Sequence, residues 1–224
     1  MGGTPVRILL ARHGETVYNV EGRWQGQSDS PLTERGVAQS RGLARALVGE
    51  PIAAVYSSDL GRAMQTAQEV ADSLTLEVQA EPRLREIATG GFTGKNRQEI
   101  DEQYPGARAR WATAPSTLRL PDGGETLLEA QTRALNFFKQ QMPEHLGQTI
   151  VVVSHGAVGQ AIVVDGMGLT LDDLWLKERV DNCQITRLEW TPEGGLRLIE
   201  MADVRHLRDV GSLGSWRTTD GEAH

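Results

Sequence analysis

The sequence predicts an α/β fold: a three-layer sandwich in which a mostly parallel central sheet carries helices on both faces. Short apolar runs, typical of buried strands, alternate along the chain with segments whose apolar residues recur at helical spacing. Three of these runs end in polar or charged residues, as strands of a parallel sheet do where their carboxyl ends form a site. The length, 224 residues, is within the reach of one large domain.

The chain begins with a predicted strand and a predicted helix. Residues 6–11 form a short apolar run, and the polar sequence Arg12-His13-Gly14-Glu15-Thr16 follows it directly. This pattern predicts a buried strand with polar residues at its carboxyl end. After a turn-rich stretch, apolar residues recur at helical spacing as far as Leu47, and Thr33 has the right type and position to cap this helix.

A second strand and a second helix follow. Residues 52–56 are apolar and lead into Ser57-Ser58-Asp59, and the next apolar residues recur at helical spacing over residues 60–74. Aspartate is a residue type that caps helices, so we expect Asp59 to cap this one. A third strand is expected near residues 76–78.

The middle of the chain shows no continuous pattern. Residues 87–123 are rich in glycine and proline, with brief helical periodicity over residues 97–104, and they are the candidate lid or insertion. Thr126 and Glu129 then have the spacing of a capping box, and the apolar residues after Thr126 continue it as a helix.

The last third contains the most strand-like run of the chain, residues 149–153, which leads through Ser154-His155-Gly156 into an apolar segment. Residues 184–190 and 196–201 are also β-like, and the loop Thr191-Pro192-Glu193-Gly194-Gly195 between them is typical of a hairpin.

The predicted domain organisation is a single domain over residues 1–210. Residues 211–224 are polar and glycine-rich, and we expect them to be a flexible tail. Asp and Glu outnumber Lys and Arg by 30 to 23, so the chain lacks the basic surface required to bind nucleic acid or an anionic membrane.

The predicted location is the cytoplasm. The one cysteine, Cys183, excludes an intrachain disulfide and indicates a reducing compartment. The sequence shows no secretory pattern at its start and no run of about 18 apolar residues, which a membrane-spanning helix needs. We therefore expect no membrane association.

The polar strand ends hold residue types that suit phosphate chemistry. Arg12 and Arg62 carry guanidinium groups that stay charged and present a planar fork of donors to phosphate oxygens. Imidazole, in His13 and His155, acts as a nucleophile, base or donor near neutral pH. Each residue alone is more often structural, but two histidines and two arginines at one edge of the sheet indicate a site for one phosphoryl group. No His-x-His or Asp-rich ligand set accompanies them, so we expect no metal ion and no cofactor.

These motifs, in this order, resemble the histidine phosphatase superfamily, which includes the cofactor-dependent phosphoglycerate mutases. The family signature RHGE[ST] matches residues 12–16, and SHG matches residues 154–156. The other matches are N…QG…D.PLT..G over residues 19–36, SSDLxRAxQTA at 57–67, LRE at 84–86 and GGE[ST] at 123–126. The resemblance implies a phosphoglycerate mutase-like α/β fold.

The resemblance also implies a role for each site residue. His13 would be the nucleophile that takes up the phosphoryl group, while Arg12, Arg62 and His155 would hold its oxygens. Glu86 would protonate the leaving oxygen and then activate the water that cleaves phosphohistidine. The residues that would bind the phosphate or line the substrate rim, besides the arginines and His155, are Asn19, Gln25, Gly26 and Gly156.

Within the family, the sequence resembles the phosphatases more than the mutases. Mutases carry a longer insertion between the acidic glutamate and the second histidine, and usually an asparagine two positions after that histidine. Here His155 lies 69 positions after Glu86, and Ala157 stands in the place of the asparagine. The resemblance therefore implies a metal-independent phosphomonoesterase that hydrolyses a small phosphorylated metabolite through a phosphohistidine intermediate.

Two alternatives stay open. One is a 2,3-bisphosphoglycerate-dependent phosphoglycerate mutase, and the other is a catalytically inactive module that binds a phospholigand or a protein. A homodimer is a further possibility. The substrate is open among phosphoserine, a phosphoglycerate derivative such as glucosyl-3-phosphoglycerate, a sugar phosphate and α-ribazole phosphate. The candidates for the walls of its leaving-group pocket are Phe92, Tyr104, Arg108, Arg110, Trp111 and Arg119, with core packing as an equal alternative for Trp111.

Overall fold

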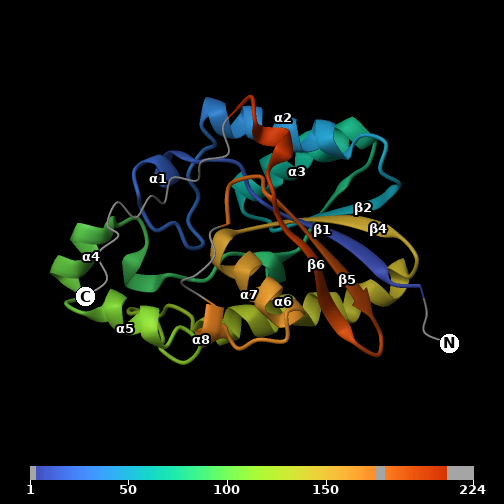
Figure 1. The fold of residues 1–224 in the computed structure, drawn as a ribbon. Helices are drawn as coiled ribbons and strands as arrows, with labels where there is room; N and C mark the ends of the chain where they lie inside the picture. Colours follow the sequence, from blue (N-terminus) through green and yellow to red (C-terminus); the bar gives the residue numbers. More distant parts are fainter. Residues whose placement is uncertain (1–3, 175–179, 211–224) are drawn as a thin grey trace.

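In a computed structural model that describes residues 4–174 and 180–210, six strands form one mixed sheet with helices on both faces (Figure 1). The strand order is β3-β2-β4-β1-β5-β6, in which the first four strands are parallel and the last two add an antiparallel hairpin. The predicted α/β sandwich with a mostly parallel sheet is confirmed. The strands are β1 (Val6–Arg12), β2 (Ile52–Ser57), β3 (Val78–Ala80), β4 (Thr149–Ser154), β5 (Ile185–Thr191) and β6 (Gly195–Asp203).

Helices cover both faces of this sheet. Helices α2 and α3 lie on one face, α6 and α7 lie on the other, and α1, α4 and α5 lie beyond the carboxyl ends of the parallel strands (Figure 1). The helices are α1 (Val17–Val20), α2 (Glu34–Leu47), α3 (Gly61–Leu74), α4 (Arg97–Gln103), α5 (Ala107–Thr113), α6 (Leu127–Gln141), α7 (Gly156–Gly166) and α8 (Leu171–Leu174). Single 3-10 turns are η1 (Pro82–Leu84), η2 (Gly90–Phe92), η3 (Met142–His145) and η4 (Arg205–Leu207).

The central strands are buried on both faces because successive side chains of a strand point in opposite directions. In β1, Ile8 and Leu10 belong to the apolar cluster that includes α6 and α7, while Leu9 belongs to the cluster that includes α2 and α3. The neighbouring strand β4 divides residues 150–153 in the same alternating way. Both strands therefore have continuous apolar sequences, as expected of parallel strands that lie between two layers of helices.

The register of the parallel strands brings their polar ends together. Arg12, the last residue of β1, pairs with Ser154, the last residue of β4. On the other side of β4, Ser57 at the end of β2 pairs with Val153. Because β4 lies between β1 and β2, the residues that follow the three strands emerge next to one another at one edge of the sheet.

Two of the predicted helix starts are confirmed. Thr33 precedes α2, and its hydroxyl accepts a hydrogen bond from the backbone N–H of Gly36 at 2.9 Å. Thr126 and Glu129 form the predicted capping box of α6, in which each side chain accepts a bond from the other residue's backbone N–H.

The expectation that Asp59 caps α3 was wrong. The helix follows Leu60, which makes no side-chain capping bond, and the first N–H of the helix, from Gly61, donates to a carboxylate oxygen of Asp29 at 2.7 Å. Asp59 instead accepts two hydrogen bonds from Arg85. A carboxylate from 30 positions earlier in the chain thus replaces the local cap.

The segment predicted as a lid contains more regular structure than its sequence suggests. It holds η2, α4 and α5 where one short helix was expected, and β3 starts two residues later than predicted. Phe92 and Trp111 are buried in the apolar cluster that includes α6, as the core-packing alternative for Trp111 expects, and the leaving-group pocket walls stay a prediction. Residues 211–224, the predicted tail, lie outside the described residues, and the single-domain organisation stays a prediction. Within the described ranges, every helix is too short or too polar to cross a membrane.

The packing of α6 against the sheet predicts a large energetic cost for truncating Phe137. This ring is 0% exposed, and its centroid lies 5.2 Å from that of Tyr56 on β2. We expect Phe137→Ala to lower the free energy of unfolding by about 3–5 kcal/mol, because it leaves a cavity in the cluster. Leu128→Ala on the same helix, where Leu128 is 48% exposed, should cost less than about 1 kcal/mol. Urea denaturation followed by circular dichroism compares the two, and equal losses would contradict this packing.

Candidate active site

The ring of His13, directly after β1, is held from two sides. Its Nδ1 lies 2.7 Å from the carbonyl oxygen of Gly14, which can only accept, so Nδ1 carries the hydrogen. Its Nε2 lies 3.2 Å from Nε of Arg62, which donates to it. The neutral ring therefore has an unprotonated Nε2 on the side of Arg62, and in this form an imidazole nitrogen can attack an electrophile.

Arg62 lies in the first turn of α3, and the loop over residues 26–29 holds its guanidinium group. Its Nη2 donates to the carbonyl oxygen of Gly26 at 2.7 Å, and its Nη1 donates to the carbonyl oxygen of Ser28 at 2.7 Å. The same Nη1 lies 3.2 Å from a carboxylate oxygen of Asp29. The Arg62 side chain is only 1% exposed, so a positive charge is buried here in one fixed orientation.

Arg12 is the second buried cation. Its Nη1 donates to the carbonyl oxygen of Val180 at 2.6 Å, whereas its buried Nε has no acceptor among the residues that the structure describes. A side-chain carbon on Gly156 would lie 3.6 Å from this Nε and 3.8 Å from Oε2 of Glu86. Arg12, Glu86 and the start of α7 therefore surround the same small space.

His155 follows β4 and precedes α7. Its Nε2 lies 2.7 Å from the hydroxyl oxygen of Ser58, and its ring centroid lies 5.2 Å from that of His13. Its Nδ1 is buried and has no partner within the described part of the chain. The two rings thus lie in adjacent positions at the carboxyl ends of the neighbouring strands β1 and β4.

Burial and positive charge keep both histidines neutral. Removal from water lowers the pKa of His13 well below its usual value of 6.5, and the charges of Arg62 and Arg12 lower it further. Burial is also the main cause that lowers the pKa of His155, followed by the charge of Arg62. Near pH 7, Nε2 of His13 is therefore free of a proton.

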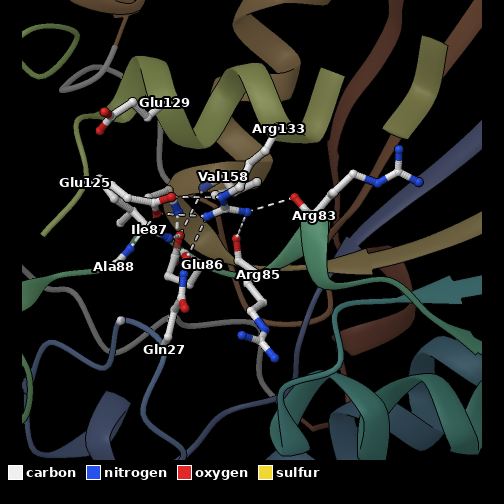
Figure 2. A network of polar contacts seen from close by, with 12 residues as sticks. Gln27, Arg83, Arg85, Glu86, Ile87, Ala88, Glu125, Glu129, Arg133 and Val158 are labelled. Atoms are coloured by element: carbon white, nitrogen blue, oxygen red, sulfur yellow. Dashed lines mark hydrogen bonds and ion pairs between the residues drawn. The ribbon is translucent and has the colours of Figure 1, made fainter. Parts of the chain in front are cut away.

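The carboxylate of Glu86 lies at the N-terminus of α7. Its Oε1 accepts hydrogen bonds from the backbone N–H groups of Ile87 at 3.0 Å and Val158 at 3.1 Å. Its Oε2 accepts one from Ala157 at 3.1 Å. Figure 2 shows Glu86 next to Val158 and to the guanidinium group of Arg133, which binds its backbone. Oε2 is the oxygen on the side of Gly156, so it is the oxygen that faces the phosphate-binding candidates.

Asn19 and Gln25 lie at the margin of this cluster. Oδ1 of Asn19 accepts hydrogen bonds from the backbone N–H of Thr16 at 3.1 Å and from Nδ2 of Asn182 at 3.4 Å. Gln25 is buried, and its Oε1 has no partner among the described residues. Gly26 has a φ of +54°, and a Cβ there would lie 2.2 Å from the hydroxyl oxygen of Thr89, so only glycine fits.

The structure therefore gathers the five residues for which the sequence predicted a catalytic role. Arg12, His13, Arg62, Glu86 and His155 lie around the carboxyl ends of β1, β2 and β4. The predicted phosphate-binding residues lie at different distances from the catalytic candidates. Gly156 lies between Arg12 and Glu86, while Asn19 is linked to His13 only through Asn182. In the described ranges, no three His, Cys, Asp or Glu side chains lie close enough to hold a metal ion.

Three supporting residues had been given no role of their own from the sequence. Ser58 contacts His155, Asp29 holds Arg62, and Nδ2 of Asn182 donates to the carbonyl oxygen of His13 at 2.8 Å. For Asn182 a signal exists in the sequence. Because β5 runs antiparallel to β1 and begins opposite Ala11, polar residues just before β5 reach the same edge of the sheet.

Comparisons with known proteins agree with one another. The family model for the histidine phosphatase superfamily, branch 1, matches residues 8–203. The chain is 37% identical over 170 residues to phosphoserine phosphatase 1 of Hydrogenobacter thermophilus, covering 76% of this chain and 80% of that protein. It is 34% identical over 219 residues to the metal-independent phosphoserine phosphatase of Arabidopsis thaliana, covering 96% and 88%.

One further relative and one solved structure are also similar over most of the chain. The chain is 33% identical over 206 residues to probable phosphoglycerate mutase GpmB of Enterobacter sp. strain 638, covering 90% of this chain and 95% of that protein. Among solved structures, Bacillus stearothermophilus YhfR matches with a TM-score of 0.84 and 34% identity, covering 90% of this chain and 99% of that one.

The neutral, buried histidines predict that stability depends on pH. Below about pH 6.5 the unfolded chain binds protons on these rings and the folded chain does not, so the free energy of unfolding should fall as the pH drops. The loss should be about 1.4 kcal/mol for each pKa unit that separates the two states of a ring. Urea denaturation of wild type and His13→Gln over a pH series measures this. The variant should lose less stability toward acid, and equal slopes would contradict a depressed pKa of His13.

Proposed function

The chain belongs to branch 1 of the histidine phosphatase superfamily and is a phosphatase of that family, and we propose that it hydrolyses a small phosphomonoester through a phosphohistidine on His13. One observation carries the proposal: two buried guanidinium groups lie beside a neutral histidine whose Nε2 is unprotonated. Buried positive charge is costly unless an anion neutralises it, and a phosphate group accepts the planar fork of donors that arginine presents. The N–H at Nε of Arg12, which has no acceptor within the described ranges, supports such an anion.

In the first step of this mechanism, Nε2 of His13 attacks phosphorus and the bond from phosphorus to the leaving oxygen breaks. That oxygen keeps the electron pair of the broken bond and takes a proton from Oε2 of Glu86. Arg12, Arg62 and His155 bind the nonbridging oxygens, where negative charge is concentrated during transfer. The alcohol then leaves.

In the second step, a water molecule attacks the phosphorus of phosphohistidine while the carboxylate of Glu86 takes its proton. The bond from phosphorus to Nε2 breaks, and its electron pair returns to His13. Inorganic phosphate leaves, and both His13 and Glu86 regain their starting protonation states. Asn19, Gln25, Gly26 and Gly156 are proposed to line the phosphate and the substrate rim.

We propose phosphoserine as the first substrate to test, and a reaction that needs no metal ion. Two relatives with 37% and 34% identity are named phosphoserine phosphatases, one of them metal-independent. In this mechanism the arginines supply the positive charge that a divalent cation supplies elsewhere. Phosphoglycerate mutase activity is the second candidate, because the relative at 33% identity carries that name.

Three further proposals rest on the sequence. We propose one domain over residues 1–210 with a lid within residues 87–123, and we propose a cytoplasmic location. We also propose that the protein has no nucleic-acid or membrane partner, since acidic residues exceed basic ones by seven. A homodimer is proposed for testing by light scattering.

The function predicts turnover without a metal ion. The purified protein should hydrolyse p-nitrophenyl phosphate and phosphoserine at unchanged rates when EDTA is present, because no step uses a metal ion. Phosphate release and p-nitrophenol absorbance are the measurements. A parallel assay with 3-phosphoglycerate and 2,3-bisphosphoglycerate compares phosphate release with isomer formation. Activity that requires added divalent metal would refute the proposal, and isomer formation faster than hydrolysis would favour the mutase.

The proposed nucleophile predicts a covalent intermediate at one residue. Mixing the protein with a labelled phosphomonoester and denaturing it in alkali should retain label on wild type, since phosphohistidine survives in base. His13→Gln should retain none, whereas His145→Gln, which changes a histidine bound to Tyr56 outside the site, should retain the wild-type amount. Label on the His13→Gln variant would assign the nucleophile to another residue.

A further inference from the structure

We propose that Arg133 on α6, together with Glu125, is a positioning residue that holds Glu86 where it exchanges protons with the leaving group and with water. This inference rests on the role of Glu86 in the proposed function. Neither Arg133 nor Glu125 touches the phosphate-binding candidates through any hydrogen bond in the described structure. Their contacts converge instead on the short segment that carries Glu86.

Arg133 makes most of the side-chain contacts that hold the backbone of this segment, and Gln27 adds one, from its Nε2 to the carbonyl oxygen of Glu86 at 3.1 Å. Glu86 lies between η1 and η2, where the chain forms neither helix nor strand. Nη1 of Arg133 donates to the carbonyl oxygens of Arg83 at 2.8 Å and Arg85 at 2.6 Å, and Nη2 donates to that of Glu86 at 2.9 Å. Figure 2 shows the guanidinium group of Arg133 at the centre of these bonds. Three carbonyl groups thus accept hydrogen bonds from one planar donor group.

Glu125 fixes that guanidinium group from the other side. Its Oε1 accepts from Nε of Arg133 at 3.1 Å, and its Oε2 accepts from Nη2 at 3.1 Å, which is a paired fork-to-carboxylate contact. Oε2 also accepts the backbone N–H of Ala88 at 2.8 Å, and the N–H of Glu125 donates to the carbonyl oxygen of Ala88 at 2.8 Å. Arg133 therefore holds the chain up to Glu86, and Glu125 holds the chain after it.

The contacts of Arg133 require the shape of a guanidinium group as well as its charge. An arginine has five N–H donors in a fixed plane, and the bonds described above use all of them. A lysine has three donors on one nitrogen and cannot reach these acceptors together. The Arg133 and Glu125 side chains are only 20% and 22% exposed, so water replaces the lost bonds poorly.

The carboxylate of Glu86 is held mainly by the first N–H groups of α7, with one further bond from the N–H of Ile87. Its backbone is therefore held chiefly from α6, and its carboxylate chiefly from α7. These two helices are themselves joined where Nε2 of Gln131 donates to the carbonyl oxygen of Ala161 at 2.7 Å. A change at Arg133 should therefore move Glu86 relative to α7 while leaving Arg12, His13 and Arg62 in place.

The proposal predicts a loss that depends on the leaving group. Arg133→Gln should slow formation of phosphohistidine from phosphoserine about 10- to 100-fold, because the serine oxygen is a poor leaving group unless it receives a proton as its bond to phosphorus breaks. With p-nitrophenyl phosphate, whose leaving group needs little protonation, the rate of the p-nitrophenol burst should change less than about threefold. KM should stay within about threefold. Rapid-quench and stopped-flow measurements give both rates, and the burst amplitude counts the folded active sites.

Arg83→Gln is the matched control. The Arg83 side chain contacts Glu81 and Gln140, so it also reaches α6, but it points away from Glu86 in Figure 2. This variant should keep wild-type rates with both substrates. Arg133→Lys keeps the positive charge without the planar fork of donors. Its rate of phosphohistidine formation from phosphoserine should fall almost as far as that of Arg133→Gln. Wild-type rates for Arg133→Lys, or equal losses with both substrates for Arg133→Gln, would overturn the positioning role.

A double-variant cycle tests whether Arg133 acts through Glu86. Glu86→Gln alone should lower the phosphoserine rate, and adding Arg133→Gln should lower it no further, because residues that act as a unit are not additive. Independent, multiplicative losses would overturn the proposal. Glu125→Gln serves as a second positioning variant if Arg133→Gln does not fold. A wild-type protein that forms no phosphohistidine would refute the proposed function itself, whereas wild-type turnover with an unaffected Arg133→Gln would refute only this inference.

Discussion

Burial of two guanidinium groups at one edge of the sheet is the constraint on which the rest of the site depends. Each N–H removed from water needs an acceptor, or a ligand that supplies one. For Arg62 the acceptors are the carbonyl groups of Gly26 and Ser28 and the carboxylate of Asp29, which fixes the course of that loop. For Arg12 the structure supplies a carbonyl group for Nη1, and among the described residues none accepts from Nε. Burial first, and then the charges of the two arginines, lower the pKa of His13 and keep its ring neutral, as the proposed nucleophile requires.

The register of the strands brings these residues together in one site. The last residues of β1 and β4 pair with each other, and β2 ends opposite the same part of β4. Side chains from positions 13, 58 and 155 therefore meet without any loop having to span a long distance. Glu86, the proposed proton donor, lies outside the sheet on an irregular segment that α6 and α7 hold from two sides. In the proposed mechanism, phosphate binding therefore depends on the strands, and proton transfer depends on helix packing.

The sequence was sufficient for features that depend on local pattern or on motif spacing. Buried strands read as apolar runs, and Thr33 and Thr126 were recognisable caps because a cap needs only neighbours three positions away. Asp59 failed as a cap because Asp29, distant in sequence, occupies that position, and no local rule can detect such competition. Core packing and pocket lining stayed open for Trp111, because its neighbours in the cluster are distant in sequence. The role of Arg133 was also invisible, since an arginine on a helix looks like a solvated residue until its acceptors are known.

The antiparallel hairpin of β5 and β6 extends from the site to the opposite end of the sheet. β5 starts beside the last residues of β1, next to the site, and ends opposite Val6, so the turn at residues 192–194 lies at the far edge of the sheet (Figure 1). Asn182, just before β5, donates a hydrogen bond to the carbonyl oxygen of His13, while the turn lies at the other end of β5. That turn is consequently the natural attachment point for a surface tether or a fluorescent label, which would leave the entrance to the site open in an immobilised or imaged protein.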